Sequence, residues 1–289
     1  TTVRSTYTIS VTVNASPLIT YPNGTVRTLR TANLVYNYDI SNTLSYSGTE
    51  TRVADLAGTS NATITSSAPY SSSYGGYLDI KPSNYLAMTT CSANIAGTSM
   101  SYFLWINPRG DGVVVDERNG TWSTASIGIY SGALKTKMYG GGSSSYTLPS
   151  LNQWYYVGIT YNGTTLKTYV NGKLVASVAS ARTTTTANCL NVGQPTGNDV
   201  GGVSTGGNFL FGALHAYSAV VTDTDVAYNY EATQKNYLIS TPQSGVYTIN
   251  TTAGFASDYS LFTASQGTGN KTFALAPTIT GITLDTSTV

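Results

Sequence analysis

The chain has 289 residues, of which 9% are charged, and its formal net charge at pH 7 is +1. Ordinary soluble domains carry roughly 25% charged residues, so Thr, Ser, Asn, Gly and Tyr must cover much of this surface. No cluster of Lys and Arg marks a nucleic-acid footprint, and no apolar run approaches the roughly 18 residues of a membrane-spanning helix. This composition favours a rigid extracellular or particle-bound protein over an intracellular enzyme.

The N-terminal part of the chain, residues 1–30, begins with strand-like alternation from Tyr7 to Val13 and continues into turn-rich sequence. We expect a β extension, either an added edge strand or half of a small domain that another segment or subunit completes. The pattern then changes. Residues 34–39 predict the first strand of a larger domain, and residues 41–73 read as a polar loop.

Several strands are predicted in the next part of the chain. Short strands are expected at residues 77–80 and 85–88, and a longer one at 99–106, where both faces are apolar as in the interior of a sandwich. Residues 122–130 and 133–139 predict a hairpin, and residues 140–145, rich in Gly and Ser, read as a flexible tip.

The stretch from Gln153 to Val175 carries the strongest β pattern. Apolar residues alternate with a period of two from Trp154 onward. Two Asn-Gly pairs, at 162–163 and 171–172, supply residues that tolerate positive φ in tight hairpin turns. An amphipathic helix is disfavoured because Val, Ile, Thr and Tyr dominate. The stretch therefore predicts an antiparallel meander of three strands.

The last part of the chain predicts a strand at residues 209–221 and then one helix at about 223–235. Thr222 and Asp225 have the spacing of a capping box at the start of that helix. Beyond Ser240 the composition remains typical of strands, with candidates at residues 245–249, 259–263 and 271–275.

Three segments of the chain resemble the laminin-G-like, concanavalin A-type jelly-roll superfamily. They are residues 34–58 with the following GGYLDI, the meander, and residues 209–238. The first and last resemble the version found in phage and large-virus structural proteins. The resemblance implies an all-β, antiparallel sandwich with one short helix and flanking β segments.

The extent of this resemblance divides the chain into an N-terminal extension (1–30), a jelly roll (31–239) and a C-terminal β segment (240–289). The final PTITGITLDTSTV resembles the opening strand of a bacterial immunoglobulin-like repeat. The alternative is a C-terminal part that pairs with the N-terminal strand.

Catalytic residues are not evident. Glycosidases need two neighbouring carboxylates, and the E-x-D-x-x-E pattern of the laminarinase-type members of the superfamily is absent. Asp111, Asp116 and Glu117 form the one acid cluster near a strand end. Adjacent acids on a strand point to opposite faces, so we interpret this cluster as a solvated turn.

His215, the single histidine, has no Ser or Cys partner that would suggest a triad. The sequence predicts a protein that is not an enzyme.

A calcium site is the one cofactor that the resemblance suggests. Asn198 and Asp199 in a Gly-rich loop, with Asp111, would supply the oxygen ligands that Ca²⁺ requires. The alternative is that the glycines only allow the loop to bend tightly.

Cys91 and Cys189 are the two cysteines. They form either one disulfide, which would stabilise the fold by about 4 kcal/mol through chain entropy, or two separate buried thiols.

Carbohydrate binding would require exposed aromatic rings. Trp122 follows an Asn-Gly turn, and Tyr74, Tyr139 and Tyr146 border Gly/Ser-rich loops. Trp105 and Trp154 lie in strongly alternating strands and are predicted to be core residues. The alternative is that exposed rings are incidental, since the chain has 23 tyrosines.

The predicted function is that of a non-enzymatic virion structural or surface protein, such as a capsid decoration, fibre or host-contact module, at the virion surface or outside the cell. The alternative is a carbohydrate-binding module of a secreted bacterial protein or adhesin. Expected partners are other copies of the chain, other virion proteins and cell-surface glycans, without nucleic acid and without membrane insertion. Exposed edge strands at both ends predict a homo-oligomer or lattice.

Overall fold

The computed structural model describes residues 4–12, 28–88, 99–119, 122–182, 189–194, 200, 202, 204–238 and 244–252. The chain separates into two compact units. One consists of Thr1–Arg27 with Leu238–Val289, and the other is Thr28–Tyr237.

The smaller unit contains one described pair of strands. β1 (Arg4–Thr12) lies antiparallel to β18 (Ser244–Thr252), with Arg4 opposite Thr252. The N-terminal strand is thus completed by a second segment of the same chain. The strands expected at residues 259–263 and 271–275, and the immunoglobulin-like sequence, lie outside the described residues.

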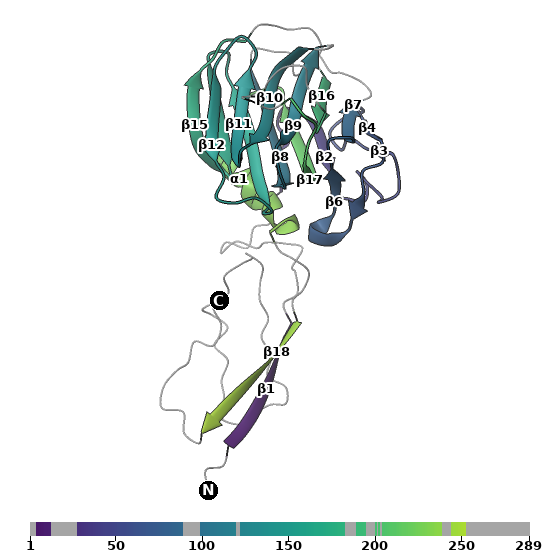
Figure 1. Cartoon of the computed structure of the whole chain (residues 1–289), viewed down its shortest axis with the longest axis vertical. Coiled ribbons are helices and arrows are strands. Elements are labelled where there is room, and N and C mark those ends of the chain that lie inside the picture. The colour runs from purple at the N-terminus through teal and green to yellow at the C-terminus, as the bar shows by residue number, and fades with distance from the viewer. Residues whose placement is uncertain are drawn as a thin grey trace. The chain divides into compact units, whose positions relative to one another are not determined.

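The larger unit is a sandwich of two antiparallel sheets (Figure 1). The β9 sheet has the order β12 (Ser143–Thr147), β11 (Ala133–Met138), β10 (Trp122–Tyr130), β9 (Gly112–Asn119), β16 (Cys189–Val192), β7 (Tyr85–Met88), β4 (Ala62–Thr65) and β3 (Arg52–Val53). The β17 sheet has the order β15 (Lys173–Ala179), β14 (Thr165–Val170), β13 (Tyr155–Tyr161), β8 (Met100–Pro108), β17 (Phe209–Tyr217), β6 (Tyr77–Ile80) and β5 (Tyr70–Ser71). This architecture confirms the predicted jelly-roll fold class.

Strand β17 organises its sheet because it has three neighbours. One edge pairs with β8 along nearly its whole length. The other edge pairs first with β6, through Phe209 to Phe211, and then with β2 (Leu34–Asp39), through Ala213 to Tyr217. β6 and β2 therefore lie one after the other along the same edge of β17.

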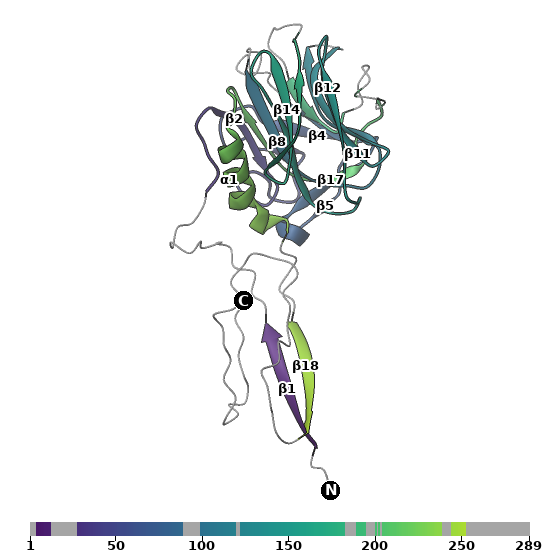
Figure 2. The same ribbon diagram turned by 90° about the vertical axis from the view of Figure 1, so that its left-hand side faces the viewer.

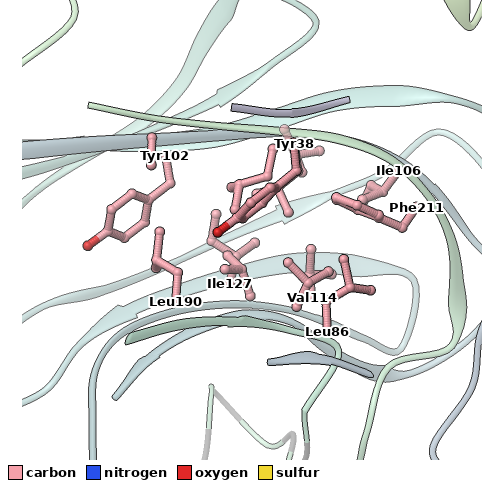
Figure 3. Close-up of a cluster of buried hydrophobic side chains, with 14 of the residues drawn as sticks. Tyr38, Leu86, Tyr102, Ile106, Val114, Ile127, Leu190 and Phe211 are labelled. Carbon is pink, nitrogen blue, oxygen red and sulfur yellow. The ribbon is translucent and has the colours of Figure 1, made fainter. Parts of the chain in front are cut away.

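The hydrophobic core lies between the two sheets (Figure 3). In that view side chains of the β17 sheet point toward those of the β9 sheet; the labelled residues are Tyr38, Tyr102, Ile106 and Phe211 on one side and Leu86, Val114, Ile127 and Leu190 on the other. Three hydroxyl groups inside the sandwich are paired with one another. The hydroxyls of Thr136, Ser144 and Thr168 lie 2.8 Å apart in a triangle that joins β11, β12 and β14.

Helix α1 (Asp223–Thr233) covers the outer face of the β17 sheet (Figure 2). A 3₁₀ turn, η3 (Gln234–Asn236), follows it. The predicted cap is confirmed, because the Thr222 hydroxyl accepts the Asp225 N–H at 3.1 Å. Beneath the helix, the Trp105 Nε1–H donates to the Thr233 hydroxyl at 2.7 Å. Trp105 and Trp154 are both buried, as predicted.

Two stretches predicted as loops contain strands. Residues 41–73 include β3, β4 and β5, and Ser143–Thr147 is the edge strand β12. The serine-rich β12 shows no hydrophobic alternation because Ser144, which faces inward, is satisfied by hydroxyls rather than by apolar packing. Among the described residues, no helix has the length and apolar character needed to cross a membrane.

Candidate functional site

Of the acid cluster, only Asp111 lies in the solvated turn that the sequence suggested. Asp116 and Glu117 lie within β9, and both are fully buried. They do point to opposite faces, as expected for neighbours on a strand. Glu117 enters the core, where it accepts a hydrogen bond from the Tyr102 hydroxyl at 2.5 Å and forms an ion pair with Arg182. Arg182 lies 65 residues away in sequence, so the spacing of the acids gives no sign of this partner.

His215 is also part of the packed interior. It lies on β17, is 2% exposed, and its Nδ1 lies 3.2 Å from the Tyr156 hydroxyl. Burial lowers the pKa of His215 from 6.5 to about 3, because desolvation disfavours the charged imidazolium. The ring is neutral at physiological pH and contacts Tyr156 rather than solvent.

The proposed calcium ligands are only partly described. Asn198 and Asp199 lie outside the described residues. Asp111 is exposed in the turn between β8 and β9, and its Oδ1 accepts the Ser131 N–H at 2.8 Å. In the part of the chain that the structure describes, no three His, Cys, Asp or Glu residues gather as a metal site would require. Calcium binding stays a prediction.

The cysteine pairing also stays a prediction. Cys189 begins β16 and packs against the hydrophobic core. Cys91 lies outside the described residues.

The four aromatic residues predicted to bind carbohydrate lie on or beside different elements of the fold. Trp122 begins β10, but its side chain is not among those described. Tyr139 follows β11 and is 42% exposed. Tyr146 lies opposite Leu134 in the ladder between β11 and β12, where it is partly buried against the core rather than exposed on a loop. Its place in the strand alternation, rather than the neighbouring loop, decides where the ring points.

Tyr74 is the predicted residue that the structure presents most distinctively. It lies in a 3₁₀ turn, η1 (Ser73–Gly75), with φ 51° and ψ 43°, and it is 37% exposed. A bulky residue rarely adopts this left-handed conformation. The next residues hold the turn in place, since a Cβ at Gly75 or Gly76 would collide with the carbonyl oxygens of Asn236 and Ile40, respectively. The close fit of this backbone fixes Tyr74 at the surface.

Strand β6 carries polar and aromatic side chains next to this turn. Tyr77 and Asp79 occupy its outward face, and Lys81 continues the same alternation. Asp79 Oδ2 lies 3.4 Å from Lys81 Nζ and 3.6 Å from Arg109 Nη1. We call Tyr74, Tyr77, Asp79, Lys81 and Arg109 the β6 strip. The strip is accessible, because the side chains of Lys81 and Arg109 are 54% and 41% exposed.

The aromatic end of the strip rests on Trp154. Its ring centroid lies 6.1 Å from those of Tyr74 and Tyr77 and 4.9 Å from that of Tyr237. The ladder between β13 and β8 ends with Tyr155 opposite Ile106, so Trp154 and Asn107 are the next residues on the two segments beyond that end.

Each of these two residues carries a buried polar atom. Trp154 Nε1 is a donor and Asn107 Oδ1 is an acceptor, and neither has a hydrogen-bond partner among the described residues. Buried polar groups are nearly always satisfied. A hydroxyl or a water molecule, which both accepts and donates, has the chemistry to satisfy such a pair.

The β6 strip combines aromatic rings with a carboxylate and two cations, groups that can make favourable contacts with a sugar. Aromatic rings offer apolar faces to the C–H side of a sugar, and a carboxylate accepts hydrogen bonds from hydroxyls more strongly than a neutral group does. Sequence reasoning identified Tyr74 alone. The period-two pattern of Tyr77, Asp79 and Lys81 was available in YLDIK, whereas the contacts with Arg109 and Trp154 depend on how distant strands pair.

Residues 81–227 match the family described as the concanavalin A-like lectin/glucanases superfamily. The chain belongs to this superfamily. The match confirms the resemblance that the sequence motifs carried. Of the β6 strip it includes Lys81 and Arg109, whereas Tyr74, Tyr77 and Asp79 precede the matched residues. A search of curated proteins found no match.

Solved structures of botulinum neurotoxin binding domains share the concanavalin A-like fold. The binding domain of neurotoxin DC in complex with SialylT aligns with a TM-score of 0.54 and 14% identity over 70% of this chain and 52% of that one. The same domain with rat synaptotagmin II gives 0.52 and 13% over 69% and 51%. A neurotoxin type C structure, described in terms of interaction with two ganglioside molecules, gives 0.53 and 16% over 69% and 51%. This chain spans about half the length of those structures, and the likeness shows the fold.

Proposed function

We propose that the jelly roll is a non-enzymatic recognition domain that binds saccharides through the β6 strip and is displayed on a virion surface or outside the cell. The observation that carries the proposal is the strip itself. Tyr74 is held at the surface by a left-handed turn, and beside it the Asp79 carboxylate is oriented by two cations.

A recognition role rather than catalysis is supported by the state of the chemically reactive side chains. Glu117 is enclosed in the core and neutralised by Arg182. His215 is buried with a pKa of about 3. Both residues serve packing and pairing, which a general acid or base exposed to substrate does not.

Display on a virion or outside the cell is supported by two features. The segments 34–58 and 209–238 resemble those of phage and large-virus structural proteins, and only 9% of the residues are charged. Solved structures with the same fold are described as binding domains, one in complex with SialylT and one with a protein. These descriptions support a role in contact with partners.

The proposal is tested by applying the purified chain and its Tyr74→Asn variant to a glycan array. Asn is among the residues that tolerate a left-handed backbone best, so this change removes the ring without adding strain. We expect binding by the unaltered chain and loss of binding by Tyr74→Asn. The control is Tyr130→Asn, which removes a similarly exposed ring at the end of β10 in the other sheet and should bind normally. Absence of binding to any glycan, or equal binding by Tyr74→Asn, would contradict the proposal.

Display on a virion requires a separate measurement. An antibody raised against the jelly roll should label purified particles from the source and should block their attachment to cells. Detection of the chain only in the particle-free secreted fraction would contradict the virion role and support the module of a secreted protein.

A further inference from the structure

The charges of the β6 strip do not cancel. Asp79 contributes one negative charge, whereas Lys81 and Arg109 contribute two positive charges. The next acid along the chain, Asp111, is engaged elsewhere, because its Oδ1 accepts the N–H of Ser131 in the β10–β11 hairpin. The strip therefore carries a net positive charge on a protein whose overall charge is only +1.

The two cations retain free hydrogen-bonding capacity. Both approach the same oxygen of Asp79, and at 3.4 and 3.6 Å the contacts are longer than close hydrogen bonds. Arginine has five N–H donors and lysine has three. One contact to Asp79 leaves most of these donors directed toward solvent, where an anionic group can accept them.

The aromatic and cationic parts of the strip lie in line along one strand. The side chains of Tyr77 and Asp79 lie on the outward face of β6, and Lys81 follows in the same alternation just after the strand. The Cα atoms of successive members of this series are therefore roughly 7 Å apart. A short oligosaccharide is long enough to contact a tyrosine ring and both cations. Asp79 lies between them, where its carboxylate can accept hydrogen bonds from sugar hydroxyls.

We infer that the β6 strip binds an acidic saccharide, with a sugar ring stacked on Tyr74 and a carboxylate or sulfate held by Lys81 and Arg109. This inference rests on the proposed saccharide-binding function and names the class of ligand. Stacking supplies the contact that is independent of charge, and the two cations select acidic sugars over neutral ones.

The test uses an array on which each glycan scaffold is present in a neutral form, a form with a carboxylate and a form with a sulfate. The unaltered chain should bind acidic forms roughly tenfold more strongly than their neutral counterparts. Added salt should weaken this preference, because both cations are exposed and screened by ions. Comparison of the two acidic forms distinguishes a carboxylate ligand from a sulfate ligand.

Variants separate the inference from the proposed function. Lys81→Gln and Arg109→Gln should lose the preference for acidic forms while Tyr74→Asn loses binding to all forms. The control is Lys135→Gln, which removes a cation from β11 of the opposite sheet and should change nothing.

Each outcome has a definite meaning. Equal binding of neutral and acidic forms, with Tyr74→Asn inactive, would overturn the acidic ligand and leave saccharide binding intact. An acidic preference that persists in both Gln variants would also overturn the inference. Absence of all glycan binding would overturn the proposed function and this inference together.

Discussion

His215 ties the stability of the protein to pH through a single buried ring. Its pKa in the folded chain is about 3, below the ordinary value of 6.5. Between these values the unfolded chain binds a proton that the folded chain excludes. The stabilising contribution is therefore complete above pH 6.5 and is lost as the pH falls toward 3.

We predict that His215→Asn removes this part of the acid sensitivity. Asn offers an acceptor close to the position of Nδ1 for the Tyr156 hydroxyl but does not titrate. The free energy of unfolding, measured by urea denaturation at several pH values, should fall less steeply in the variant, by up to about 1.4 kcal/mol per pH unit below 6.5. Identical pH dependence in the two proteins would show that His215 is not the source.

The buried pair of Glu117 and Arg182 gives a second prediction at this scale. Glu117→Gln leaves a buried guanidinium without its counter-charge, and the expected loss is about 3–5 kcal/mol of unfolding free energy. Adding Arg182→Met removes the uncompensated charge and should recover part of that loss, measured by the same denaturation. A double variant as unstable as Glu117→Gln alone would contradict this account.

Individual residues were predictable where alternation within one strand decides their surroundings. Trp105 and Trp154 were correctly assigned to the interior because both lie in strongly alternating sequence. For Tyr146 the adjoining loop suggested an exposed ring, whereas its position opposite Leu134 directs it toward the core and leaves it partly buried. Arg182 and Arg109 could not be linked to their acids, since both ion pairs join segments that meet only in the folded sheets.

At the scale of elements, helix α1 depends on its first turn. The Thr222 hydroxyl accepts the Asp225 N–H, and Asp223 accepts hydrogen bonds from Lys167 and Tyr169 on β14. We predict that Thr222→Ala lowers the unfolding free energy by about 1 kcal/mol. The matched control Thr224→Ala changes an exposed threonine in the same turn and should be close to neutral. Equal losses in the two variants would indicate that the cap is not responsible.

Strands and helices were predicted correctly where the nearby sequence contains a clear turn or cap motif. The meander β13–β14–β15 was recognised from its turns, and Asn171 and Gly172 do have positive φ. The helix was recognised from its cap and begins at Asp223 as predicted. β3, β4 and β5 were missed because they are short and lie at or near sheet edges, where pairing with a neighbour rather than a buried apolar face defines the strand.

At the scale of the whole molecule, self-association remains a prediction from the sequence. We expect the chain to sediment as a homo-oligomer at micromolar concentration. Removal of residues 1–27 and 238–289 tests whether the smaller unit is responsible for this association. A truncated jelly roll, Thr28–Tyr237, that sediments like the full chain would exclude the smaller unit. A monomeric full chain would contradict the prediction.

The sharing of β17 by β2, β6 and β8 has a consequence for biosynthesis. β6 ends at Ile80, but its inner neighbour β17 begins only at Phe209. A ribosome must therefore complete most of the polypeptide before the tyrosines and charges of this strand are held in their final geometry, and such distant pairings form slowly. Translation products that stop before Phe209 lack the strand that pairs with β6, so β6 cannot take its place in the sheet in such molecules.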